Sequence, residues 1–142
     1  MLDELKMYAK EKLSGKTKVS YDLVGNMGNN EVTRFYGAHY IDGFVNVSSV
    51  EGIPVSIMEA CSFGIPIIAT DVGGTGEIVK DNYNGYLLPV DFSDKLLSST
   101  IAGLLKNKSK TEQLRKNARV EWEDHYNEDW NYQLFANSLL DL

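Results

Sequence analysis

Cysteine and excess positive charge are both scarce in this chain of 142 residues. The single cysteine, Cys61, cannot form an internal disulfide, which is the cysteine usage expected in a reducing compartment. The chain has 14 basic and 20 acidic residues, so its formal net charge is -6. We therefore expect no nucleic-acid partner and no electrostatic adhesion to an anionic membrane, because both need a basic surface.

Long apolar runs and clusters of metal ligands are missing as well. No run of 18 apolar residues could form a transmembrane segment, and the first four residues do not resemble a signal sequence, so we expect a cytoplasmic protein. The two histidines, His39 and His125, have no Cys or His cluster around them, so we expect both to be surface or packing residues. The sequence predicts no metal site.

The length and the apolar content suit one folded unit. A chain of 142 residues with 43% hydrophobic residues can build a core of its own, so we expect residues 1–142 to form a single domain.

The stretch EGIPVSIMEA, which begins at Glu51, organises the rest of the chain. Upstream of it, residues 44–48 read as a short buried strand, and the loop that follows carries Glu51. Pro54 suits a first helical position, and Gly64 ends the helical run, so Glu59 lies in a helix. The two glutamates therefore belong to a strand, loop and helix unit and do not share a helix face.

Apolar residues at helical spacing predict which side of that helix is buried. The predicted buried positions are Val55, Met58 and Cys61 or Ser62. Cys61 then reads as a small buried hydrophobic residue. In open parallel sheets, ligands bind outside the carboxyl ends of the strands, so the loop that carries Glu51 is the candidate site.

Elsewhere, helical and strand patterns alternate along the chain. We predict helices over residues 2–13, 31–40, 77–79, 93–105, 109–126 and 128–142, and further strands over 18–24, 66–70 and 86–90. This alternation predicts an α/β fold, a Rossmann-like three-layer α/β/α arrangement with a mostly parallel sheet and a helical C-terminus.

The segment FVNVSSVEGIPVSIMEACSFGIPIIATDVGGTGEIVKDNYNGYLL resembles the donor-binding core of the retaining glycosyltransferases of the GT-B fold, family 4. The resemblance rests on the spacing of Glu51 and Glu59, on Gly-Ile-Pro before a strand, on Gly73-Gly74 with Glu77 after it, and on Asn84-Gly85. It is close over residues 44–88 and looser from about residue 18 to the C-terminus.

The resemblance implies roles for individual residues. Glu51 would lie against the donor sugar near the reacting carbon, and Glu59 would accept hydrogen bonds from the ribose hydroxyls. The free amides at the helix start would meet the diphosphate of a UDP-, GDP- or ADP-sugar, with no metal and no separate cofactor. The donor-binding set implied besides Glu51 and Glu59 is Gly52, Ile53, Val55, Ser56, Gly73 and Gly74.

Plainer structural interpretations stand beside these roles. Gly73-Gly74 can be an ordinary turn between a strand and a helix. Glu77 can favour a helix N-terminus or contact a ligand. Ser48 is better interpreted as a hydrogen-bonding residue at a strand end than as a ligand.

The resemblance also implies that the pocket is incomplete. Enzymes of this family have two Rossmann-like domains, and this chain resembles most of the second. We expect the N-terminal acceptor domain, and an Arg and a Lys that grip the diphosphate, to lie outside this chain. The isolated chain is then expected to bind nucleotide weakly if at all and to transfer no sugar, and peripheral membrane association of the full-length enzyme stays open.

Two alternative functions remain at this stage. The chain could be a non-catalytic nucleotide-sugar-binding module that acts with a separate partner chain. It could also be a fragment of a GT-B sugar-nucleotide epimerase, although the segment with both glutamates and Gly73-Gly74 fits the transferases better.

Aromatic residues gather near the C-terminus, and we expect them to pack between helices. Without a first domain, part of this surface is expected to be exposed and to self-associate. The residues are Trp122, Tyr126, Trp130, Tyr132 and Phe135.

Overall fold

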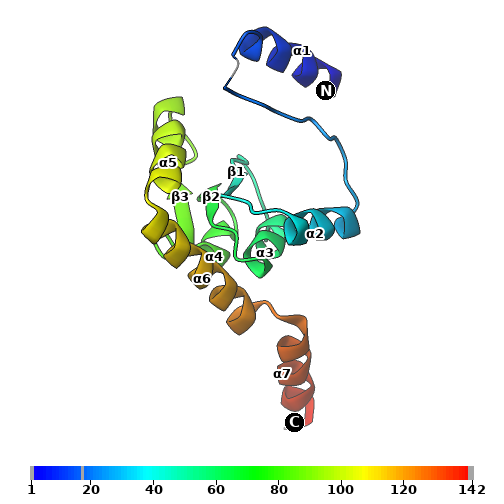
Figure 1. Cartoon of the computed structure of the whole chain (residues 1–142). Coiled ribbons are helices and arrows are strands. Elements are labelled where there is room, and N and C mark those ends of the chain that lie inside the picture. Colours follow the sequence, from blue (N-terminus) through cyan, green and yellow to red (C-terminus); the bar gives the residue numbers. More distant parts are fainter. Residues whose placement is uncertain (1, 17, 141–142) are drawn as a thin grey trace. The chain divides into compact units, whose positions relative to one another are not determined.

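A computed structural model of the chain describes residues 2–16 and 18–140, which belong to two compact units, Met1–Phe35 and Tyr36–Leu142 (Figure 1). The first unit contains helix α1 (Leu2–Leu13), an irregular segment and the start of helix α2 (Asn29–Ala38). The predicted helix over 2–13 is confirmed. The single-domain expectation stays a prediction.

The predicted strand over residues 18–24 is wrong. The described residues of this segment are irregular, and the alternating apolar side chains of Val19, Tyr21 and Val24 are about half exposed. A period-2 pattern stabilises a strand only where a neighbouring strand pairs with it, and the described chain offers this segment none. Helix α2 starts two residues earlier than predicted, where the Glu31 carboxylate accepts the Gly28 N–H at 2.9 Å.

A parallel sheet of three strands lies at the centre of the second unit. Strands β1 (Phe44–Asn46), β2 (Ile67–Thr70) and β3 (Gly85–Leu88) lie side by side in the order β1-β2-β3. Helices α3 (Val55–Ser62) and α4 (Thr75–Ile78) connect them. The predicted α/β fold with a parallel sheet is confirmed, and every residue of β2 is buried, as expected for a central strand.

Three further helices complete the chain: α5 (Asp94–Lys106), α6 (Lys108–His125) and α7 (Glu128–Leu140). Ser93 caps α5 by accepting the Leu96 N–H on its side-chain oxygen at 3.2 Å, as its position before the helix predicted. The last two residues of the predicted 128–142 helix lie outside the described residues. None of the described helices is long and apolar enough to cross a bilayer.

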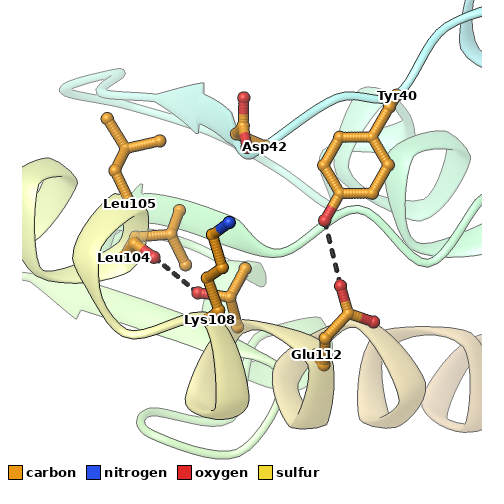
Figure 2. Close-up of a pocket in the computed structure, with 7 residues that line it drawn as sticks. Tyr40, Asp42, Leu104, Leu105, Lys108 and Glu112 are labelled. Carbon is orange, nitrogen blue, oxygen red and sulfur yellow. Dashed lines mark hydrogen bonds between the residues drawn. The ribbon is translucent and has the colours of Figure 1, made fainter.

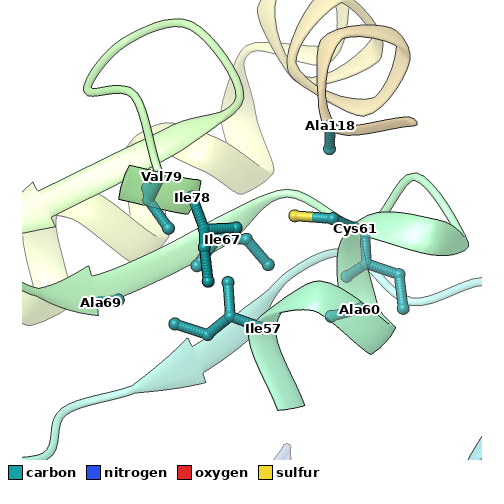
Figure 3. Packing of buried hydrophobic residues seen from close by; sticks show 9 residues of the cluster. Ile57, Ala60, Cys61, Ile67, Ala69, Ile78, Val79 and Ala118 are labelled. Atoms are coloured by element: carbon teal, nitrogen blue, oxygen red, sulfur yellow. The ribbon is translucent and has the colours of Figure 1, made fainter. Parts of the chain in front are cut away.

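Apolar side chains cover both faces of the sheet, which confirms the three-layer arrangement. On one face, Ile67 and Ala69 of β2 join a cluster with α3 and α6 (Figure 3). On the other face, Ile68 of β2 packs in a cluster with Leu104 of α5 and Leu114 of α6. Burial of this apolar surface is the main stabilising term of the fold.

The predicted buried side of α3 is partly wrong. Val55 is 62% exposed, whereas Ile57, Ala60 and Cys61 are fully buried. Met58 packs only partly against the same cluster. The apolar residues of this short helix fit two phases, and contact with β2 and α6 selects the phase that buries Cys61.

Asn84 ties the start of β3 to the end of α4, and Gly85 lets β3 lie close against β2. The fully buried Asn84 donates from Nδ2 to the Ile78 carbonyl at 2.8 Å and accepts the Lys80 N–H on Oδ1 at 2.7 Å. A Cβ atom at Gly85 would lie 2.4 Å from the carbonyl oxygen of Ile67. These two residues therefore act in packing, and they hold the neighbouring strand ends in place.

Candidate active site

The loop after β1 is tied together by the last side chain of that strand. Asn46 donates from Nδ2 to Oε1 of Glu51 at 3.2 Å. Its Oδ1 accepts the Ser48 N–H at 3.2 Å and the Ser48 hydroxyl at 2.8 Å. This loop therefore holds the Glu51 carboxylate at the carboxyl end of β1. Ser48 is a hydrogen-bonding residue, as predicted, but it lies in the loop, because β1 ends at Asn46 and not at residue 48.

Hydrogen bonding within this loop favours the ionised form of Glu51. The side chain of Ser48 and, to a smaller extent, that of Asn46 lower the pKa of the Glu51 carboxyl by hydrogen bonding, while burial opposes them. The carboxylate is partly exposed, so it carries a negative charge that a ligand can reach at neutral pH. A fixed carboxylate of this kind can accept hydrogen bonds from hydroxyl groups and can stabilise a nearby positive charge.

The loop after β2 lies directly against the loop that carries Glu51. The Gly74 N–H donates to the Gly52 carbonyl at 2.7 Å, and the Thr70 hydroxyl donates to the Ser48 carbonyl. Gly73 has a φ of 52°, and a Cβ atom there would lie 1.9 Å from the Glu51 carbonyl oxygen. The structure thus brings Glu51, Gly52, Gly73 and Gly74 together, and no side chain fits at position 73.

The start of α3 lies at the same edge. Pro54 precedes the helix, and its carbonyl accepts the Ile57 N–H at 3.0 Å, while no side chain caps this end. The first amides of a helix have no partner within it, so those of Val55 and Ser56 point toward the helix N-terminus. Ile53, Val55 and Ser56 are all exposed, which leaves this end open to an anion.

Glu59 lies one turn further along α3, away from the loop. It is half-buried and close enough to Tyr36 to help raise the pKa of that phenol, a shift caused first by burial. The Tyr36 ring packs against the core and meets Phe63 edge-on at 5.7 Å between ring centroids. The structure therefore places the two glutamates on one loop and helix unit, with Glu59 near an aromatic side chain of α2.

Two residues of this edge escaped the sequence analysis. Asn46 and Thr70 each end a strand and bond to the loop after β1, yet both were interpreted only as strand residues. For Thr70 the available signal was a polar residue at the end of an otherwise apolar strand, and for Asn46 it was an amide side chain in the middle of an apolar strand pattern.

A separate pocket of about 360 Å³ lies at the opposite, amino edge of the sheet (Figure 2). In it, the Tyr40 hydroxyl donates to Glu112 at 3.0 Å, beside Asp42, Leu104 and Lys108. Asp42 comes before β1, whereas Glu51 follows it, so this pocket shares no residue with the edge that holds Glu51.

The chain belongs to the family described as glycosyl transferases group 1, which it matches over residues 3–121. It is 34% identical over 119 residues to sucrose-phosphate synthase 4 of Arabidopsis thaliana, covering 74% of this chain and 11% of that protein. The chain thus spans about a tenth of the length of this curated relative.

Solved structures share the fold. HepE of Anabaena in complex with UDP-glucose superimposes with a TM-score of 0.77 at 23% identity, over 99% of this chain and 37% of that one. The C-terminal domain of the group 1 glycosyl transferase LpcC from Francisella tularensis gives a TM-score of 0.71 at 23% identity, over 88% of this chain and 64% of that one. The fold is therefore that of a C-terminal domain of a GT-B glycosyltransferase.

Proposed function

We propose that this chain is the donor-binding half of a retaining, metal-independent glycosyltransferase of family 4. Its substrate would be a nucleotide-diphospho-sugar, and its acceptor a glycan, a lipid or another hydroxyl compound. The observation that carries the proposal is Glu51, whose carboxylate is held by Asn46 and whose backbone packs against the loop after β2, near the open N-terminus of α3. Family membership and the UDP-glucose in the HepE structure support the choice of ligand.

The proposed roles follow the geometry of this edge. The amides of Val55 and Ser56 would bind the diphosphate, with Ile53 and Gly52 beside it. Gly73 and Gly74 would leave the surface below the donor free of side chains. Glu51 would bind sugar hydroxyls and stabilise the oxocarbenium-like transition state. Glu59 would accept hydrogen bonds from the ribose hydroxyls.

The reaction balances without a further reagent. The bond between the anomeric carbon and the diphosphate oxygen breaks, and its electron pair stays on the diphosphate. The acceptor oxygen bonds to the same carbon with retained configuration, and its proton leaves with the diphosphate. Amides and cationic side chains would neutralise the leaving group, so we propose a reaction that needs no metal.

The proposal includes a second half of the pocket. The acceptor-binding domain, and the cations that grip the diphosphate, would come from residues outside this chain, and the isolated chain would bind the donor weakly and transfer no sugar. The family's reaction is part of polysaccharide and glycoconjugate synthesis, and the cysteine usage favours the cytoplasm.

A thermal-shift panel tests the proposed function. UDP, GDP and ADP, each with its sugar conjugates, are compared at millimolar concentration, because a ligand that binds only the native state raises its stability. One base should raise the melting temperature, and Glu59→Ala should abolish that rise. The control Glu11→Ala removes an exposed carboxylate of α1 and should leave the rise intact. A rise that survives in Glu59→Ala would contradict ribose recognition by Glu59.

A further inference from the structure

Asn46 is placed to orient the carboxylate of Glu51, on which the proposed reaction depends. It is the last residue of β1, is half-buried, and uses both ends of its side-chain amide. Oδ1 accepts from the backbone and the hydroxyl of Ser48, and Nδ2 donates to Oε1 of Glu51. Only a side chain with one acceptor and one donor at this spacing can hold both partners.

The rest of the loop is held independently of Asn46. The Thr70 hydroxyl donates to the Ser48 carbonyl, and the Gly74 N–H donates to the Gly52 carbonyl. The backbone on both sides of Glu51 is therefore fixed by β2 and the loop that follows it. Asn46 adds the orientation of the Glu51 carboxylate. A carboxylate has about four acceptor positions; the bond from Asn46 occupies one of them and leaves the others for a ligand.

We infer that Asn46 is a positioning residue that orients the Glu51 carboxylate for the donor sugar. The inference rests on the proposed function and extends it to a residue that never touches the substrate. An oriented carboxylate loses less conformational freedom when it binds sugar hydroxyls, so donor affinity and turnover should both depend on Asn46.

Asn46→Asp separates this role from plain strand packing. The aspartate has the same shape and keeps an acceptor for Ser48, but it replaces the donor to Glu51 with a second negative charge. The pKa of Glu51 should then rise, because the ionised form loses a hydrogen bond and gains a like charge. Side-chain carboxyl NMR of the 142-residue chain measures this titration, with Glu51→Gln used to assign the signal.

Asn117→Asp is the matched control. Asn117 also uses both ends of its amide, donating to the Tyr83 carbonyl at 2.7 Å and accepting from Gln113 at 2.9 Å, on α6. This variant should lose a similar hydrogen bond and leave the titration of Glu51 unchanged. If Asn46→Asp does not fold, Asn46→Ala removes the same donor without adding a charge and should raise the pKa of Glu51 in the same direction.

Binding of UDP-glucose gives the second readout. At a pH where Glu51 is ionised in both forms, Asn46→Asp should bind about fivefold more weakly than the natural chain, the effect of one lost hydrogen bond. Asn117→Asp should bind like the natural chain. An unchanged Glu51 titration in Asn46→Asp, or equal losses of affinity in both variants, would overturn the inference. If no form binds the nucleotide sugar at millimolar concentration, the proposal that the isolated chain binds the donor weakly fails, and the titration alone still decides whether Asn46 orients Glu51.

Discussion

Gly73 shows at the scale of one residue how closely the two loops approach each other. Its φ of 52° is a conformation that side chains disfavour, and the Glu51 carbonyl occupies the place of a Cβ atom. The glycine is needed for packing whether or not a ligand binds. The two interpretations of Gly73-Gly74, turn and binding element, are therefore compatible.

We predict that Gly73→Ala destabilises the chain by about 1–3 kcal/mol, because the methyl group must displace the loop that carries Glu51. Urea unfolding followed by circular dichroism measures the change. The control Gly103→Ala lies within α5 with no atom within 4 Å of the added methyl, and it should stabilise by about 0.5–1 kcal/mol. Equal stability of Gly73→Ala and the natural chain would show that the two loops are not packed in this way.

Cys61 is a residue of the core and not of the site. It is fully buried on α3, and burial, followed by the charge of Glu121, raises the pKa of its thiol to about 12. The prediction that Cys61 is a small buried hydrophobic residue is confirmed.

The raised pKa of Cys61 predicts a loss of stability in alkali. Above about pH 9, the ordinary value for a thiol, the unfolded chain ionises Cys61 while the folded chain does not, so the free energy of unfolding falls between about pH 9 and 12. The natural chain should therefore lose more stability over this range than Cys61→Ala does, measured by urea unfolding at each pH. Parallel pH profiles of the two forms would show that the thiol ionises freely in the fold.

At the scale of the elements, helices were easier to predict than strands and loops. Residues 2–13 and the cap at Ser93 carry local signals, a helical stripe and a capping side chain, and both appear as predicted. The strand pattern at 18–24 needed a neighbouring strand that the described chain does not give it. Pairing of this kind depends on residues far away in the sequence, so a local pattern cannot decide it.

The site was predictable in its position and less so in its detail. The order of strand, loop and helix placed Glu51 at the carboxyl edge, which is where the structure has it. The role of Thr70 depends on its bond to Ser48, 22 residues away in the sequence. Asn46 bonds to residues two and five positions away, but the conformation of the loop that brings them to its amide is not a local sequence pattern. The structural partner of Glu59, Tyr36, likewise comes from a different helix.

Helix α7 exposes apolar side chains along most of its length. Six of its larger apolar residues are at least half exposed: Trp130, Tyr132, Leu134, Phe135, Leu139 and Leu140. By contrast, Trp122 and Tyr126 of the preceding segment pack against the core. The expected packing between helices is therefore confirmed for these two, and the expected exposure of part of the aromatic surface is confirmed for Trp130, Tyr132 and Phe135.

We expect this surface of α7 to make the isolated chain self-associate. The double variant Trp130→Gln and Phe135→Gln should shift sedimentation velocity toward the monomer across a concentration series. The control pair Leu105→Gln and Val120→Gln removes exposed apolar groups from α5 and α6 and should leave the association unchanged. A natural chain that sediments as a monomer at all concentrations would contradict the expectation.

At the scale of the whole molecule, we propose that the chain supplies one side of a pocket. The structural match to HepE covers 99% of this chain but 37% of HepE. The edge of the sheet that carries Glu51 is open to solvent. A half-pocket of this kind offers a ligand few contacts, which is why we expect weak binding by the isolated chain. The pocket around Tyr40 and Glu112 gives an internal comparison, because it lies at the other edge of the same sheet.

Amide NMR of the 142-residue chain titrated with UDP-glucose tests the location of the site most directly. We predict chemical-shift changes that rise with millimolar ligand at Gly52, Ile53, Ser56, Gly73 and Gly74, with little change at Tyr40, Lys108 and Glu112. Changes centred on those last three residues, or no changes at any concentration, would contradict a donor site at the carboxyl edge of the sheet.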